Sequence, residues 1–98
     1  MRTKIEFRLS RSDVKLYMSY ITSLIEEYGI IREHREISVL KTEEDYYYYI
    51  CYMFKEIVNY VEILVKREKT VTRYLKLEKD YEDICRNFAG FMKRTRCK

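Results

Sequence analysis

The sequence contains no proline and no tryptophan, and it has only two glycines. So little glycine leaves no room for the glycine-rich loop that usually cradles a nucleotide phosphate, and this excludes that class of site. A structural zinc site needs about four cysteine or histidine ligands in local pairs. The chain has three cysteines without a Cys-x-x-Cys pair and a single histidine, His34. We therefore predict no metal and no cofactor.

Catalytic motifs are missing as well. The sequence has no His-Glu-x-x-His segment and no Ser/His/Asp arrangement of the known kinds. His34 could in principle act as a general base, but it lies in the charged run Arg32-Glu33-His34-Arg35-Glu36, which is typical of a solvated segment. We predict that the protein is not an enzyme.

The length of 98 residues corresponds to one domain. Apolar residues make up 47% and charged residues 37% of the chain, a balance typical of a folded globular protein. No run approaches the roughly 20 apolar residues of a membrane helix, and no secretory signal follows the N-terminal basic residues. We expect a single globular domain over residues 1–92 and a basic tail over 93–98. The expected location is intracellular (the host cytoplasm if the protein is viral), without a membrane partner.

Two stretches alternate between apolar and polar residues, as half-buried strands do. The first is Thr3–Leu9, where every second residue is apolar. The second lies within Ile30–Leu40, where Ile37 and Val39 alternate with polar neighbours. We predict that these two strands pair in a small sheet.

Three longer stretches repeat apolar residues every three or four positions, which predicts amphipathic helices. They are Val14–Tyr28, a segment beginning near Tyr47, and Tyr74–Met92. Gly29 suits the left-handed end of the first helix, and Thr42-Glu43-Glu44-Asp45 resembles a capping box before the second. The expected order is β-α-β-α-α, a helix-rich α+β fold with a two-stranded sheet and three amphipathic helices.

The middle of the chain also has a strand-like interpretation. Tyr46–Phe54 and Val61–Val65 are rich in residues that favour strands, and Val61–Val65 could pair with Val71–Leu77. If residues 46–77 form strands, the fold is an antiparallel sheet with two helices. The turn Arg67-Glu68-Lys69 lacks the Gly, Asn or Asp that hairpin turns use, which favours the helix.

Four consecutive tyrosines, residues 46–49, cannot all face the interior of a helix, because successive side chains point about 100° apart. Tyrosine is enriched at protein interfaces because it is large, rigid and amphipathic. We predict a partner or dimer interface at Tyr48, Tyr49 and Tyr52. The alternative is a central helix that is buried on nearly all sides.

The net charge of +4 lies in the last six residues, since residues 1–92 are neutral overall. A second, weaker basic stretch lies at the N-terminus. Basic termini can follow a phosphate backbone, whereas the alternative is a solvated helix end. The candidate nucleic-acid-binding residues are Arg2, Lys4, Arg8, Arg11, Lys93, Arg94, Arg96 and Lys98.

The segment Lys4-Ile5-Glu6-Phe7-Arg8-Leu9-Ser10, followed by a helix and Gly29-Ile30, resembles the opening of ribbon-helix-helix repressors. In that family the polar face of the strand enters the DNA major groove as a dimeric ribbon. The resemblance implies that Lys4, Glu6 and Arg8 would read bases. The family begins its second helix after the glycine, whereas this chain continues with strand-like alternation over Arg32–Val39, so we do not adopt its fold.

The rich use of Lys, Glu and Arg is typical of thermophile proteins, and the overall composition suggests a product of a virus or mobile element. Broad apolar helix faces and surplus tyrosine predict a small non-enzymatic interaction module. We expect it to form a homodimer and to bind a host or viral protein, as small inhibitors of host defence do. The alternative is a nucleic-acid-binding regulator that uses the basic N- and C-terminal segments.

Overall fold

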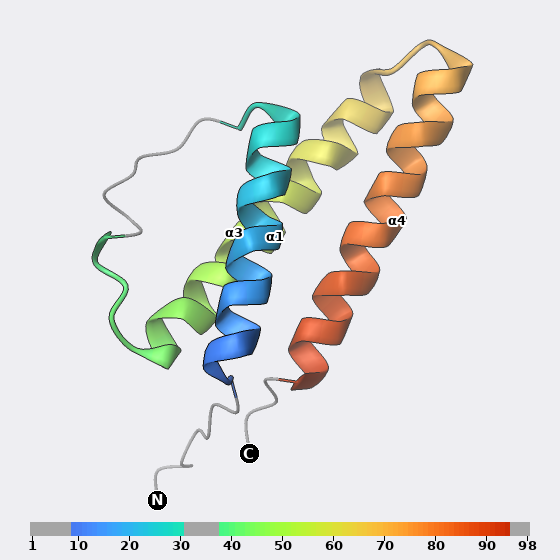
Figure 1. Cartoon of the computed structure of the whole chain (residues 1–98). Helices are drawn as coiled ribbons and strands as arrows, with labels where there is room; N and C mark the ends of the chain where they lie inside the picture. The colour runs from blue at the N-terminus through green and yellow to red at the C-terminus, as the bar shows by residue number, and fades with distance from the viewer. Residues whose placement is uncertain (1–8, 31–37, 95–98) are drawn as a thin grey trace, which may run out of the picture.

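The computed structural model describes residues 9–30 and 38–94, and these form an all-α structure of three helices (Figure 1). The helices are α1 (Arg11–Tyr28), α3 (Glu43–Arg67) and α4 (Val71–Arg94). No residue within the two described ranges belongs to a strand. The predicted α+β fold with a two-stranded sheet is therefore wrong, and so is the alternative antiparallel sheet over residues 46–77.

The physical reason for the first error lies at the ends of the α1–α3 connection. Ile30 and Leu40 pack against the core there. Val39, which a half-buried strand would turn inward together with Ile37, is 66% exposed. A short alternation of apolar and polar residues, such as the one in this connection, is therefore not sufficient to predict a strand. Ile37 itself and most of the first predicted strand, residues 3–8, lie outside the described residues.

The ends of α1 are set by its own sequence. The Ser10 hydroxyl accepts a hydrogen bond from the backbone N–H of Asp13 over 3.1 Å, which satisfies one of the free donors of the first turn. At the other end, Gly29 has φ 64° and lies in the left-handed region, and its N–H donates to Glu26. The Gly29 cap agrees with the sequence prediction.

The long helix α3 begins at a complete capping box. The Thr42 hydroxyl accepts from the Asp45 N–H, while the Asp45 carboxylate accepts from the Thr42 N–H, each over 3.1 Å. The Asp45 carboxylate also accepts from the Lys41 N–H over 3.1 Å, and the bonds from the Thr42 and Lys41 N–H groups lower the pKa of Asp45. The helix then continues unbroken through Arg67, so apolar periodicity prevailed over strand propensity in this segment.

The core follows the predicted apolar face of α3. Five residues of that face are buried: Tyr47, Ile50, Phe54, Ile57 and Val61. The ring of Phe54 lies at the centre of an aromatic cluster that joins the three helices, with neighbours Tyr17 and Tyr20 from α1 and Phe88 and Phe91 from α4. Two side chains assigned to the apolar faces, Leu16 and Tyr74, are exposed instead.

Helix α3 packs against both other helices, whereas no Cα atom of α1 comes within 8 Å of one in α4. Long side chains span the remaining distance, and the rings of Tyr17 and Phe91 meet edge to face with centroids 4.7 Å apart. The hairpin of α3 and α4 extends past the C-terminal end of α1 (Figure 1). None of the described helices combines the length and apolar character that crossing a bilayer requires.

Candidate protein-binding groove

An apolar groove runs between α3 and α4. Its volume is about 450 Å³. Val58 from α3 and four residues of α4 (Cys85, Phe88, Ala89 and Met92) form its walls, with Lys55 and Asn59 as its polar lining residues. A groove of this kind offers a surface for apolar side chains and holds few groups that could carry out chemistry.

Aromatic stacking fixes the floor of the groove. The Phe88 ring lies nearly parallel to the buried ring of Phe54, with centroids 4.8 Å apart and an angle of 4° between the planes. The outer part of Phe88 is half-buried and faces the groove. Phe54 is completely buried, so Phe88 packs directly on the core, and the groove is present in the structure without a partner.

Sulfur-containing side chains line the remainder of the groove. The Cys51 thiol lies 3.8 Å from the thioether sulfur of Met92, and this contact ties the end of α4 to α3. Cys85 is a free thiol. The electrostatic interaction and hydrogen bond with Cys85 raise the pKa of the Tyr81 phenol. Methionine and cysteine side chains adapt their shape to a partner.

The tyrosine run is divided between the surface and the core. Tyr48 is 52% and Tyr52 56% exposed, whereas Tyr49 is only 8% exposed and belongs to the core. Tyr48, Tyr52, Lys55 and Asn59 are spaced by four, three and four residues, so they follow one side of α3 that leads to the groove. Of the three predicted interface residues, the structure leaves Tyr48 and Tyr52 accessible.

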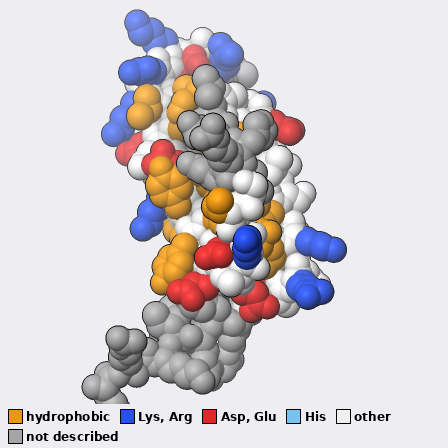
Figure 2. Space-filling model, turned by 90° about the vertical axis from the view of Figure 1, so that its left-hand side faces the viewer, with side chains coloured by type: hydrophobic (Ala, Val, Ile, Leu, Met, Phe, Trp, Pro, Cys, Tyr) orange, Lys and Arg blue, Asp and Glu red, His pale blue; other side chains and the backbone are white. Residues whose placement is uncertain are grey.

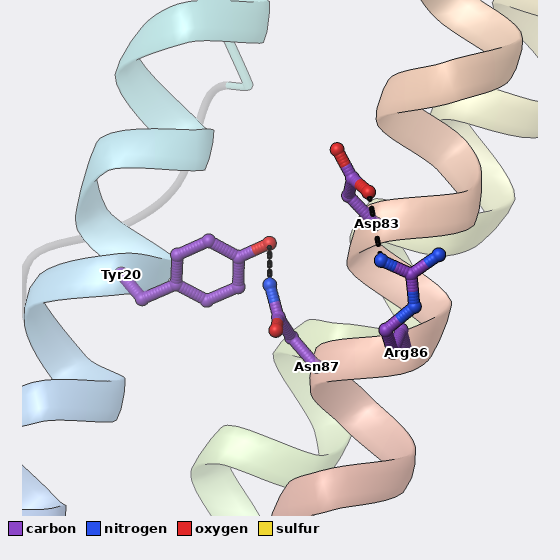
Figure 3. Close-up of polar contacts among 4 residues, drawn as sticks. All are labelled: Tyr20, Asp83, Arg86 and Asn87. Atoms are coloured by element: carbon purple, nitrogen blue, oxygen red, sulfur yellow. Dashed lines mark hydrogen bonds and ion pairs between the residues drawn. The ribbon is translucent and has the colours of Figure 1, made fainter.

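The opposite side of α4 faces α1 across a polar cleft of about 370 Å³. In Figure 3, Tyr20 reaches from α1 to Asn87, whose amide donates to the phenol oxygen over 2.8 Å, and Arg86 pairs with Asp83. Burial raises the pKa of Tyr20. Because these polar groups form hydrogen bonds and an ion pair with one another, we interpret the cleft as a polar contact between the helices. Within the described part of the chain, no cluster of three His, Cys, Asp or Glu residues could hold a metal ion.

The described basic residues of the two termini lie at one end of the molecule. Arg11 begins α1, and Lys93 and Arg94 form the last turn of α4. The Arg94 guanidinium lies 3.3 Å from the Asp13 carboxylate, which holds these helix ends together. The other candidate residues lie outside the described residues: Arg2, Lys4, Arg8, Arg96 and Lys98.

The sequence analysis did not predict the α4 side of the groove, because it treated Tyr74–Met92 only as an amphipathic helix. The available signal was the width of the apolar face of α4, where Cys85 and Met92 flank the main stripe. The chain matches no family model, no curated protein and no solved structure.

Proposed function

We propose that the protein is a non-enzymatic interaction module whose α3–α4 groove receives an apolar helix of a protein partner. The observation that carries the proposal is the preformed apolar groove, extended along α3 by the exposed rings of Tyr48 and Tyr52. Exposed aromatic side chains beside an apolar depression are typical of the centres of protein interfaces. The partner helix would place side chains spaced by three and four residues over Phe88 and Met92.

The same surface is suited to self-association. Two copies related by a two-fold axis could lay their α3–α4 faces against each other, because such an interface uses one patch twice. We therefore include a homodimer in the proposal. As an accessory or regulatory protein of a virus or mobile element, the module would bind a host or viral protein, for example a component of host defence. The composition alone supports that setting.

Two exposed positions test the groove without disturbing the core. Ala89→Arg would fill the groove with a charged side chain, and Tyr52→Lys would remove an aromatic ring from its edge. Leu16→Gln is the matched control, because Leu16 is an exposed apolar residue on α1 away from the groove. Sedimentation equilibrium at micromolar concentration measures the mass of each variant. We expect a dimer for the wild type and the Leu16 variant, and weaker dimerisation for the two groove variants.

Affinity capture from nuclease-treated lysate of the natural cells tests the partner. We expect the wild-type chain and the Leu16→Gln variant to retain the same protein, and Ala89→Arg to lose it. Equal capture by all three chains would contradict a role for the groove. A partner released only by nuclease would instead indicate a nucleic-acid bridge.

A second candidate function is nucleic-acid binding by the basic termini. The Arg94–Asp13 ion pair supports it, because that contact joins the start of α1 to the end of α4, so that Arg11 and Lys93 lie at the same end of the molecule. A phosphate backbone could then contact both segments at once.

Fluorescence anisotropy with a labelled DNA duplex tests this candidate. Affinity should fall steeply as salt rises, because Lys and Arg release counterions from the DNA. The double variant Arg11→Gln/Lys93→Gln should bind all sequences more weakly, whereas Arg86→Gln/Lys55→Gln, which also removes one exposed arginine and one exposed lysine, should change affinity less. Equal weakening by both double variants would contradict a site at the termini.

A further inference from the structure

The turn between α3 and α4 is strongly basic. Residues 66–79 contain six basic and two acidic residues, a net charge of +4 that equals the net charge of the whole chain. All six basic side chains are exposed: Lys66, Arg67, Lys69, Arg73, Lys76 and Lys79. Figure 2 shows Lys and Arg side chains gathered at the upper end of the molecule, where α3 ends and α4 begins. We call residues 66–79 the basic tip.

Acidic side chains neutralise little of this charge. One carboxylate oxygen of Glu68 accepts from the backbone N–H of Thr70 (3.0 Å) and of Lys69 (3.2 Å), so this carboxylate caps the turn. Those bonds lower the pKa of Glu68, with a smaller contribution from the positive charge of Arg73. Lys66 pairs with Glu62 over 3.2 Å. Among the described residues, no carboxylate comes within the 4.0 Å of an ion pair with the other five cations.

Two aliphatic side chains project from the same tip. Val71 is 72% exposed and Leu75 is 58% exposed. They are four residues apart and therefore lie on one side of the first turns of α4. Neither lines the pocket beside the turn, which is formed by other residues of the three helices, among them Tyr60, Arg67 and Leu77. Val71 and Leu75 are therefore exposed side chains that lie outside this pocket.

We propose that the basic tip binds the surface of an anionic lipid bilayer. Val71 and Leu75 would enter the headgroup region, while the surrounding cations contact lipid phosphates and carboxylates. A nucleic acid would use the cations but leave both aliphatic side chains in water. An acidic peptide would need a concave site for its apolar residues. A bilayer accounts for both the charge and the exposed aliphatic pair, and it does so without any residue of the α3–α4 groove.

Co-sedimentation with vesicles tests the proposal. The full chain should sediment with vesicles that contain phosphatidylcholine and phosphatidylserine, and stay in the supernatant with phosphatidylcholine alone. Lys69→Glu/Lys76→Glu should reduce partitioning by at least about tenfold, because each cation near an anionic surface adds to binding. Val71→Thr/Leu75→Gln keeps the charge and should reduce partitioning by about tenfold. These side chains are exposed, so circular dichroism should show unchanged helix content and melting.

Matched variants elsewhere provide the controls. Leu16→Gln removes an exposed apolar residue from α1, and Lys15→Glu/Lys55→Glu reverses two cations away from the tip. If these variants weaken vesicle binding as much as the tip variants do, the tip is not the site. Absence of binding to anionic vesicles would overturn the proposal. The proposal would also be overturned if a DNA oligonucleotide bound more strongly than the vesicles and its binding depended on Lys69 and Lys76. In that case, Val71→Thr/Leu75→Gln would bind both the DNA and the vesicles as well as the wild type does.

Discussion

The phenol of Tyr28, at the end of α1, donates a hydrogen bond to the carboxylate of Asp80 in the middle of α4 over 3.0 Å. This bond links the two helices whose backbones do not approach each other. Tyr28→Phe keeps the ring and removes only the hydroxyl. We expect a loss of about 1 kcal/mol in the free energy of unfolding, since the site is only partly buried.

Urea denaturation followed by circular dichroism measures that loss. Tyr60→Phe is the control, because the Tyr60 hydroxyl makes no hydrogen bond with any described residue. Similar losses in the two variants would mean that the Tyr28–Asp80 bond contributes nothing of its own.

Stability should fall at alkaline pH. Burial and the hydrogen bond to Asp80 raise the pKa of Tyr28 above its ordinary value of 10.0, and burial also raises that of Tyr20. The folded state thus holds these phenols in the neutral form more firmly than the unfolded chain does. These two phenols contribute fully to the free energy of unfolding below pH 10, and this contribution is lost as the pH rises above 10. Melting temperatures across this range should decline for the wild type and more gently for Tyr28→Phe. Parallel curves for both chains would contradict the role of Tyr28.

The two glycines should respond to alanine in opposite directions. Gly29 has φ 64°, a conformation that costs an L-residue about 1 kcal/mol, so Gly29→Ala should destabilise the protein by about that amount. Gly90 lies inside α4, and no atom stands within 4 Å of where its Cβ would be placed. Gly90→Ala should therefore stabilise the protein by about 0.5–1 kcal/mol. Thermal melts of the two variants give the signs, and a shared sign would contradict one of the two assignments.

Phe54 should be the most sensitive position of the core. It is completely buried and its ring contacts aromatic rings from both other helices. Phe54→Ala leaves a cavity where these rings meet, and we expect a loss of about 3–5 kcal/mol. Ile63→Ala, on the exposed side of the same helix, should cost far less. Equal midpoints in urea for the two variants would contradict the central place of Phe54.

Features set by neighbouring residues were predictable from the sequence. The Gly29 cap of α1 and the Thr42–Asp45 box of α3 each involve residues within one helical turn, and the structure confirms them. The apolar faces of α3 and α4 were also predictable, because packing repeats with the helical period. The predicted sheet failed because alternation over a few residues, such as those around Val39, also occurs in a connection.

The candidate site depends on contacts between distant segments, which the sequence does not display. Tyr48 and Tyr49 are adjacent and chemically identical, yet only Tyr49 belongs to the core, because the neighbouring segments determine which side of α3 is covered. The groove likewise exists only because Val58 and Phe88, far apart in the chain, line the same space. The basic tip was not predicted from the sequence, because its charges are divided between two helices and the turn that joins them.

Because the backbones of α1 and α4 lie apart, the molecule has two parts that differ in stability, which are α1 and the hairpin of α3 and α4. Detaching α1 would break its packing on α3 and the side-chain bridges to α4, but α3 and α4 would still lie along each other. Backbone amides of α1 should therefore exchange with deuterium through such partial opening, while those around Ile57 should exchange only when the whole structure unfolds. A pulse of deuterium followed by mass spectrometry would display this order, with α1 labelled first and the centre of α3 last.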